Sequence, residues 1–393
     1  MAKVMVLGGA GAFGRGVSRL FAASDAVAEL VLGGRRVEPM AKLASELGPK
    51  VAVVQVEATD EERLASVLSD FDLVANLAGP EFVVQLPVLR AAIRAGAHYC
   101  DIAGDSPTTE RALELATEAE KAGVTAITGI GVVPGVSNLM MMHAAAQFDQ
   151  ANSLAFCSYF PVVTASWLDP KRVHEEIAAT GRVDAALQII TKWVSRPARS
   201  YEDGRWVDLD PRVNKWEMTL PQGGVVRAHP SCSTEPITIP RYVPGIRTVR
   251  SLICLYPPQF DQLYLEAGEL LASGKADAAG ATRRFYEEAV KDSGEWPATS
   301  VSYSRNIEGW VTATGRKGDK VGRYYGAVLG EWLSTQAMIA AAGLRILRGQ
   351  IPEKGVFPPE ACFDPMPFLI EASELVGKRP KDDKFLDERF TWA

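Results

Sequence analysis

The sequence predicts an α/β fold: a doubly wound parallel sheet with helices on both faces, followed by a second α+β domain with a mixed sheet. Two observations predict the first part, namely a glycine-rich turn between the first strand and the first helix, and the alternation of strands and helices over residues 1–131. The pattern changes after that point, which predicts a second domain over residues 132–393. A length of 393 residues also favours two domains over one.

The glycine-rich turn is the clearest motif in the chain. Residues 1–7 form a short apolar run typical of a buried strand, and apolar residues at helical spacing follow the turn. In this setting the G-x-G-x-x-G pattern permits a tight turn, close approach of a pyrophosphate, and close packing of helix on strand. An ordinary glycine-rich loop is the alternative. The residues predicted to bind the dinucleotide here are Gly9, Gly11, Ala12, Phe13 and Gly14.

The end of the second strand indicates which dinucleotide is bound. An acidic residue about twenty positions after the glycines would accept a hydrogen bond from the ribose of NAD. The chain instead has Gly34, Arg35 and Arg36 at this place, and two guanidinium groups suit the 2′-phosphate of NADP. The alternative is a solvated arginine pair on a loop. We therefore predict NADP (NADPH) as the cofactor.

The other elements of the first domain follow in strict alternation. A capping box of Thr59 and Glu62 is expected to open the third helix, and Thr59 and Asp60 are further candidates for cofactor contact. The other predicted strands cover residues 29–32, 51–56, 71–77, 98–102 and 124–127. The other predicted helices cover residues 39–47, 84–95 and 109–122.

The second domain is predicted from a less regular pattern. The expected strands cover residues 154–160 and 248–256, with a hairpin at 310–314 and 321–325. The expected helices cover residues 171–194 and 331–347, and the C-terminal helical segment could pack back on the first domain.

Composition narrows the classes of function. The net charge of −6 argues against general nucleic-acid binding. The five cysteines lack C-x-x-C spacing, and the four histidines lack metal-site spacing, so we expect reduced thiols, no metal and a cytoplasmic protein. Residues 122–148 contain no Asp, Glu, Lys or Arg, but the glycines and proline in the middle fit a strand, a loop and a helix better than a membrane span.

Four segments together resemble the saccharopine dehydrogenase family, in addition to the glycine motif. They read LVANLAGP at 73–80, AGAHYCDIAGD at 95–105, GIGVVPGVSN at 129–138 and GVFPPE at 355–360. The third is more similar to lysine-6-dehydrogenase-like members than to fungal saccharopine reductases. The resemblance implies a pyridine-nucleotide oxidoreductase that acts at the carbon–nitrogen bond of amino acids, amines or imines, and a homodimer formed through the second domain. The arginine pair departs from NAD-using lysine dehydrogenases.

Polar residues at the carboxyl ends of strands are the candidates for the site. Asn76, Ala78, Gly79 and Pro80 follow the fourth strand and are expected near the ribose and nicotinamide, although Asn76 could simply satisfy the turn.

Tyr99 and Asp101 share one face of the fifth strand by period two. They are expected either to contact a substrate amine or to tie the strand to its loop. Because the resemblance implies that the segment around His229 and Glu235 faces the substrate, these two residues complete the catalytic candidates. A loop histidine bonded to backbone is the alternative for His229. The substrate is expected between the end of the fifth strand and the second domain.

Three functions remain open from sequence. The first is an NADP-dependent oxidoreductase that reduces an imine or oxidises an amine of a small-molecule substrate. The second is a carbonyl reductase, which the absence of a Tyr-x-x-x-Lys pair disfavours. The third is a non-catalytic NADP-binding sensor or scaffold.

Overall fold

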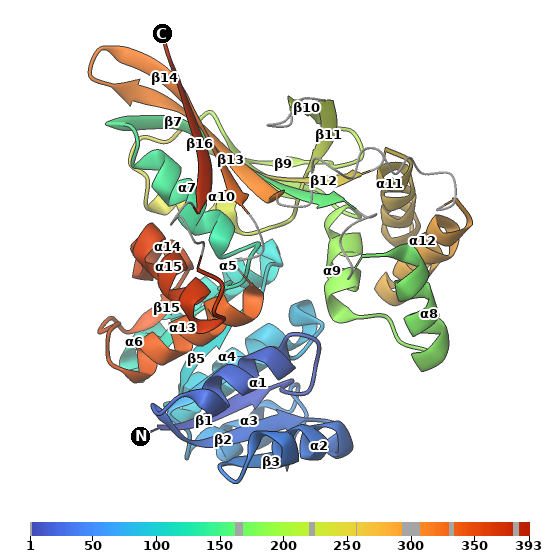
Figure 1. Ribbon diagram of the computed structural model, residues 1–393, viewed down its shortest axis with the longest axis vertical. Coiled ribbons are helices and arrows are strands. Elements are labelled where there is room, and N and C mark those ends of the chain that lie inside the picture. The colour runs from blue at the N-terminus through green and yellow to red at the C-terminus, as the bar shows by residue number, and fades with distance from the viewer. Residues whose placement is uncertain are drawn as a thin grey trace. The chain divides into compact units, whose positions relative to one another are not determined.

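The computed structural model describes residues 2–161, 168–219, 225–256, 258–292, 307–329, 334–379 and 385–393. The chain forms two compact units, which are described separately. Unit 1 comprises Met1–Leu139 and Trp332–Arg379, and unit 2 comprises Met140–Glu331 and Pro380–Ala393. Unit 1 thus includes a C-terminal segment as well as the blue and cyan first third of the chain (Figure 1).

Unit 1 contains a seven-stranded sheet in the order β15-β6-β5-β4-β1-β2-β3, in which all neighbouring strands are parallel. The order of its first six strands along the chain, 3-2-1-4-5-6, is that of a Rossmann sheet, which confirms the predicted fold class. The strands are β1 (Ala2–Leu7), β2 (Val27–Gly34), β3 (Val51–Gln55), β4 (Leu73–Asn76), β5 (His98–Asp101), β6 (Thr125–Ile127) and β15 (Gly355–Phe357).

Helices cover both faces of this sheet (Figure 1). On one face Met5, Leu7 and Val74 pack with apolar residues of α3, α4, α5 and α6 in a single core. α1 and α13 pack together so closely that a Cβ on Gly343 would lie 2.7 Å from the Phe21 ring. The helices are α1 (Gly14–Ala23), α2 (Val37–Leu47), α3 (Glu61–Leu68), α4 (Glu81–Ala95), α5 (Ser106–Glu114), α6 (Ala116–Lys121), α13 (Thr335–Leu347), α14 (Pro359–Cys362) and α15 (Pro365–Leu375). The boundary between the units falls within α7 (Val136–Ala145).

Two local predictions in unit 1 are wrong. The cap of α3 is Asp60, whose carboxylate accepts the backbone N–H of Arg63 at 3.2 Å, so Thr59 and Glu62 do not form a capping box. The predicted helix at 109–122 is two helices, α5 and α6, which meet at Leu115. At α3 several polar residues compete for the cap position, and Asp60 takes it. α6 instead begins after Leu115 with no side-chain cap.

The seventh strand, β15, was not expected from the sequence. It adds to β6 in parallel, with Val356 opposite Ala126. Next to it, the side chain of Asn138 accepts a hydrogen bond from the N–H of Gly135 at 2.9 Å and donates one to Glu360 at 2.9 Å. The segments 129–138 and 355–360, which carry much of the family resemblance, are therefore joined inside unit 1.

Unit 2 contains a nine-stranded sheet in which β12 and β7 are parallel and the other paired strands are antiparallel, so the predicted mixed sheet is confirmed. The main order is β10-β11-β12-β7-β13-β14-β16, and the β8–β9 hairpin joins at β12. The strands are β7 (Gln150–Pro161), β8 (Ala198–Glu202), β9 (Arg205–Leu209), β10 (Trp216–Thr219), β11 (Val225–Pro230), β12 (Thr248–Tyr256), β13 (Ile307–Lys317), β14 (Lys320–Leu329) and β16 (Leu386–Trp392).

The hairpin predicted at 310–325 is present as the longer pair β13 and β14. The helical stretch predicted at 171–194 is interrupted by Gly181, which adopts a left-handed conformation with φ of +67° at the end of α8. The predicted helix at 331–347 begins at Thr335, and residues 331–333 lie outside the described residues. The helices of unit 2 are α8 (Pro170–Thr180), α9 (Ala185–Trp193), α10 (Glu235–Thr238), α11 (Pro258–Ala272) and α12 (Ala278–Asp292).

Two features are absent from the described residues, a membrane-spanning helix and a cluster of metal ligands. No helix among them is long and apolar enough to cross a membrane. Within the same residues, no group of three or more His, Cys, Asp or Glu side chains is arranged to hold a metal ion.

Candidate functional site

The turn after β1 has the backbone geometry of a dinucleotide loop. Gly8 adopts φ of +78°, and a Cβ there would lie 2.7 Å from the carbonyl carbon of Leu77, so the left-handed residue stands just before the predicted motif. A Cβ on Gly14 would collide with the carbonyl oxygen of Gly8, which explains why the helix can approach the strand only with glycine at this position.

Gly11 lies on the open side of the same turn. A Cβ there would have one neighbour within 4 Å, the carbonyl oxygen of Gly8 at 3.1 Å, and the residue is exposed. α1 begins directly afterwards with no side-chain cap and no acidic residue in its first turn. An open surface above an uncapped helix N-terminus suits an anionic pyrophosphate, so the residues present fit a dinucleotide.

We expect Gly11→Val to abolish nucleotide binding without unfolding unit 1. The new side chain would point into the open side, where the pyrophosphate is expected, while φ at this residue is not left-handed. Nucleotide titration monitored by fluorescence measures the first effect, and thermal unfolding measures the second. Gly11→Ala is the graded control and should weaken binding less. Unchanged affinity in a folded Gly11→Val protein would show that the turn is only a structural loop.

Arg35 and Arg36 stand exposed between β2 and α2, as the sequence predicts. The carbonyl of Arg35 accepts a hydrogen bond from Gln55, which ties the end of β2 to β3. Among the described residues, no ion pair involves either guanidinium. Thr59 and Asp60 are also exposed after β3, but the carboxylate of Asp60 is used to cap α3. The arginine pair is therefore available to a phosphate.

Tyr99, Asn76 and Asp101 form a hydrogen-bonded row across the carboxyl ends of β4 and β5. The amide of Asn76 donates to the Tyr99 hydroxyl at 3.2 Å, and that hydroxyl donates to Asp101 Oδ2 at 2.7 Å. Asn76 also accepts the N–H of Ala78 at 3.1 Å, so it does satisfy its turn. Burial raises the pKa of Tyr99 well above its ordinary value, so the hydroxyl keeps its proton.

Asp101 is the centre of this network and is 1% exposed. Its Oδ1 accepts the backbone N–H groups of Ala103 at 3.0 Å and Gly129 at 2.8 Å. Gln85 of α4 donates to Oδ2 at 3.0 Å, and Thr128 donates to Oδ1 at 3.0 Å. Burial raises the pKa of Asp101, and these donors oppose the rise. The carboxylate thus joins the ends of β4, β5 and β6 to α4.

Glu81 is a residue at this edge that the sequence analysis missed. It is the first residue of α4, directly after Pro80, and its Oε1 accepts the N–H of Gly104 at 2.7 Å. Burial raises its pKa from an ordinary 4.5 to about 8, and the charges of Asp105 and Asp101 add to the rise. The sequence feature that could have identified Glu81 is its position directly after the Gly-Pro pair that follows the fourth strand.

This raised pKa predicts how stability depends on pH. Between pH 4.5 and about 8 the folded chain holds a proton on Glu81 that the unfolded chain has released. The folded state is therefore favoured most below pH 4.5, and this contribution is lost as the pH rises through about 8. In denaturant unfolding at pH 5, 7 and 9, the unfolding free energy of wild type should fall as the pH rises, and it should fall more than that of Glu81→Gln. Glu62→Gln, an exposed acid in the first turn of α3, is the control and should follow wild type. An equal fall in unfolding free energy for wild type and Glu81→Gln would contradict the raised pKa of Glu81.

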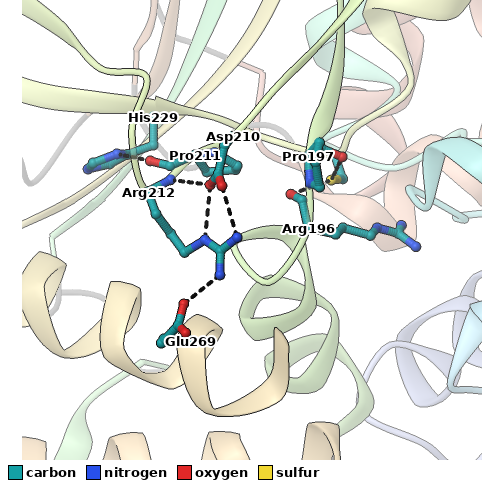
Figure 2. Close-up of polar contacts among 8 residues, drawn as sticks. Arg196, Pro197, Asp210, Pro211, Arg212, His229 and Glu269 are labelled. Atoms are coloured by element: carbon teal, nitrogen blue, oxygen red, sulfur yellow. Dashed lines mark hydrogen bonds and ion pairs between the residues drawn. The ribbon is translucent and has the colours of Figure 1, made fainter. Parts of the chain in front are cut away.

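His229 lies in unit 2, within β11 rather than a loop, and is 1% exposed. Its Nδ1 donates to the carbonyl of Pro211 at 2.7 Å, and Nε2 pairs with Asp261 Oδ2 at 2.9 Å. Figure 2 shows the ring directed at Pro211. Glu235 is fully buried as the first residue of α10. Both ring nitrogens of His229 thus have partners within unit 2.

Ion pairs near His229 hold the segment after β9 in place. Arg212 binds Asp210 through two nitrogens, at 3.0 and 2.9 Å, and donates to Glu269 of α11 at 2.6 Å (Figure 2). The hydrogen bonds from Arg212 lower the pKa of Asp210. The guanidinium is therefore neutralised by two carboxylates, which fits a structural role.

Comparison with known proteins gives one family match and several relatives. Residues 4–127 match the family described as the saccharopine dehydrogenase NADP binding domain, which supports the predicted NADP(H) cofactor. A carboxyaminopropylagmatine dehydrogenase of Synechocystis is 25% identical over 95% of this chain and 96% of its own length. A saccharopine dehydrogenase (L-glutamate-forming) of Schizosaccharomyces pombe is 25% identical over 41% of this chain and 34% of its own.

Similarity to solved structures extends over the whole chain. The saccharopine dehydrogenase (L-Glu forming) of Saccharomyces cerevisiae superposes with a TM-score of 0.59 at 17% identity, and the match covers 100% of both chains. The homospermidine synthase of Legionella pneumophila gives 0.57 at 11% identity, covering 99% of this chain and 91% of the other. At these low sequence identities, the structural similarity is evidence of a shared fold alone.

Proposed function

We propose that this chain is an oxidoreductase of the saccharopine dehydrogenase family that reduces an imine or oxidises an amine at a carbon–nitrogen bond, with NADP(H) as its cofactor. When bound, the cofactor supplies or accepts the hydride. In this proposal the glycine turn holds the pyrophosphate, Arg35 and Arg36 bind the 2′-phosphate, and Asn76, Ala78, Gly79 and Pro80 line the ribose and nicotinamide side.

The observation that carries the choice of bond is the charge at the carboxyl edge of the unit 1 sheet. Asp105 and Asp101 lie there beside Glu81, and theirs are the charges that act most on the Glu81 carboxyl group. A negative environment stabilises the positive charge of an iminium or ammonium group. It would oppose the negative oxygen that develops when a carbonyl is reduced. The edge therefore favours carbon–nitrogen chemistry over carbonyl reduction.

The names of the relatives support the same class. The relative similar over nearly its whole length is a dehydrogenase named for carboxyaminopropylagmatine, and the others are named for saccharopine. All of these names denote amino compounds. We propose a substrate of that class for this chain, bearing at least one cationic group to meet the acidic edge.

The roles proposed for the candidates Asp101, His229 and Glu235 differ. Asp101 already accepts hydrogen bonds from Tyr99, Gln85, Thr128 and two backbone N–H groups, so it acts as a positioning residue. Catalytic roles for His229 and Glu235 stay predictions, and the pairing of both His229 nitrogens speaks for a structural role. A cytoplasmic homodimer also stays a prediction.

A substrate screen tests the proposal. NADPH oxidation is followed at 340 nm, on the order of a hundred amine–carbonyl pairs are offered, and each carbonyl is also offered alone. We expect turnover that requires the amine partner, and none with Gly11→Val. Turnover with carbonyls alone would favour a carbonyl reductase instead. Tight NADPH binding without turnover on any pair would favour the sensor or scaffold.

A further inference from the structure

We propose, on the basis of the function proposed above, that Glu81 donates the proton to the substrate nitrogen during reduction and removes it during oxidation. Glu81 was not among the candidates predicted from the sequence, where His229 was the residue suited to proton transfer. Three observations within unit 1 support it: the position of Glu81 next to the dinucleotide turn, its surroundings, and the unsuitability of its neighbours for the same task.

The position follows from the segment that links β4 to α4. The start of this segment lies against the dinucleotide turn, because Leu77 and Ala78 are the nearest neighbours of a Cβ on Gly8. Its end is Glu81, whose carboxyl group is bonded to the N–H of Gly104 after β5. Glu81 therefore lies at the carboxyl edge between the turn that binds the pyrophosphate and the end of β5. In a doubly wound sheet that is where the reacting end of the ligand is found.

The surroundings suit a group that exchanges protons near neutral pH. Burial and the charges of Asp105 and Asp101 hold the pKa of Glu81 at about 8, so at pH 7 to 8 both of its protonation states are populated. As a residue, Glu81 is also partly exposed, unlike Asp101, which leaves a way for a substrate and water to approach it. Its hydrogen bond to Gly104 fixes the orientation of the carboxyl group.

The other titratable side chains of β5 are less suitable. The Tyr99 hydroxyl is committed to Asp101, and burial raises its pKa well above the ordinary value. Asp101 has both oxygens occupied by donors of its own unit. Burial also raises the pKa of the Cys100 thiol, and period two directs that side chain to the opposite face of the strand.

The proton and electron balance is simple. The substrate carbon accepts a hydride with its electron pair, the π electrons of the C=N bond move to nitrogen, and nitrogen takes the proton from the Glu81 carboxylic acid. The products are an amine, the oxidised cofactor and a Glu81 carboxylate, which solvent protonates again. Amine oxidation reverses each step.

A binding experiment tests this placement without a substrate. The nicotinamide ring is cationic in NADP⁺ and neutral in NADPH, so a nearby Glu81 should lose its proton when NADP⁺ binds and not when NADPH binds. Calorimetric titration at pH 7.5 in buffers of different ionisation enthalpy measures this proton release. We expect release with NADP⁺ only, its loss in Glu81→Gln, and its retention in Glu62→Gln. Equal proton release for the two cofactors, or release that persists in Glu81→Gln, would overturn the inference.

Activity is the second readout. With a substrate from the screen, Glu81→Gln should lower kcat by about a hundredfold, in the range expected for a lost general acid, with the Kd for NADPH within about twofold of wild type. Glutamine can still accept the N–H of Gly104, so the fold should be retained. Wild-type kcat and pH profile in Glu81→Gln would overturn the inference and leave the proposed function standing. Proton release that depends on Glu81, with turnover of carbonyls alone, would count against the proposed function and not against the placement of Glu81.

Discussion

Replacing Arg35 and Arg36 together with alanine is expected to weaken NADPH binding by at least about a hundredfold and to change NADH binding little. Each charge-assisted contact to the 2′-phosphate contributes about 1.5–3 kcal/mol, and the double substitution removes both. Because the two side chains are exposed and have no ion pair among the described residues, their loss should not destabilise unit 1. Titration of both cofactors at a fixed, low salt concentration measures the effect.

A control with the same change of net charge exists in unit 2. Arg283 and Arg284 are also adjacent and exposed, and they lie on α12. Replacing them with alanine changes the net charge equally, so it reports any general effect of charge on nucleotide binding. Equal losses for NADPH and NADH in the Arg35/Arg36 variant, or equal losses in the two double variants, would contradict recognition of the 2′-phosphate.

Replacing Asp101 with asparagine is expected to lower the unfolding free energy by about 1–3 kcal/mol and kcat/KM by tenfold or more. The backbone N–H groups of Ala103 and Gly129 hold an oxygen at the Oδ1 position, so the new amide nitrogen falls where Oδ2 was. There it meets Tyr99 and Gln85, which both donate to the native carboxylate. NADPH affinity should be nearly unchanged. Denaturant unfolding and steady-state kinetics measure the two effects.

Tyr99→Phe tests the contribution of one hydrogen bond to Asp101, apart from that of the whole network. It removes one donor to Asp101 and leaves those from Gln85, Thr128 and the backbone in place. We expect a smaller loss of stability than in Asp101→Asn. Wild-type stability and kcat/KM in Asp101→Asn would show that the network is neither structural nor a support for the site.

The carboxyl edge of unit 1 shows how far local sequence signals extend. Period two correctly placed Tyr99 and Asp101 on one face of β5, because alternation is a property of any strand. It could not show that Gln85 and Thr128 complete the set around the carboxylate, since these residues come from α4 and from the end of β6. Glu81 was missed for the same reason: its environment consists of residues 101, 104 and 105, which the fold brings to it.

In unit 2, too, the hydrogen-bond partners of a candidate residue could not be predicted from the sequence. The chemistry of His229 suggested proton transfer when its partners were unknown. The structure supplies Pro211 and Asp261 for its two nitrogens, and both partners are distant in sequence. The hairpin of β13 and β14 was predictable because its pairing is local, whereas the edge strand β16 comes from residues far along the chain.

The sequence by itself determined the nucleotide-binding half of this protein. A glycine pattern, an arginine pair and the alternation of strands and helices act through neighbours in the chain, and these signals were enough for the Rossmann sheet and its predicted phosphate contacts. Only the tertiary structure decided that β15 completes that sheet, that Asp101 is surrounded by donors and that Glu81 stands in an acidic, shielded place. The physical reason is that burial and charge–charge proximity, which set hydrogen-bond partners and pKa values, depend on segments that meet only after folding.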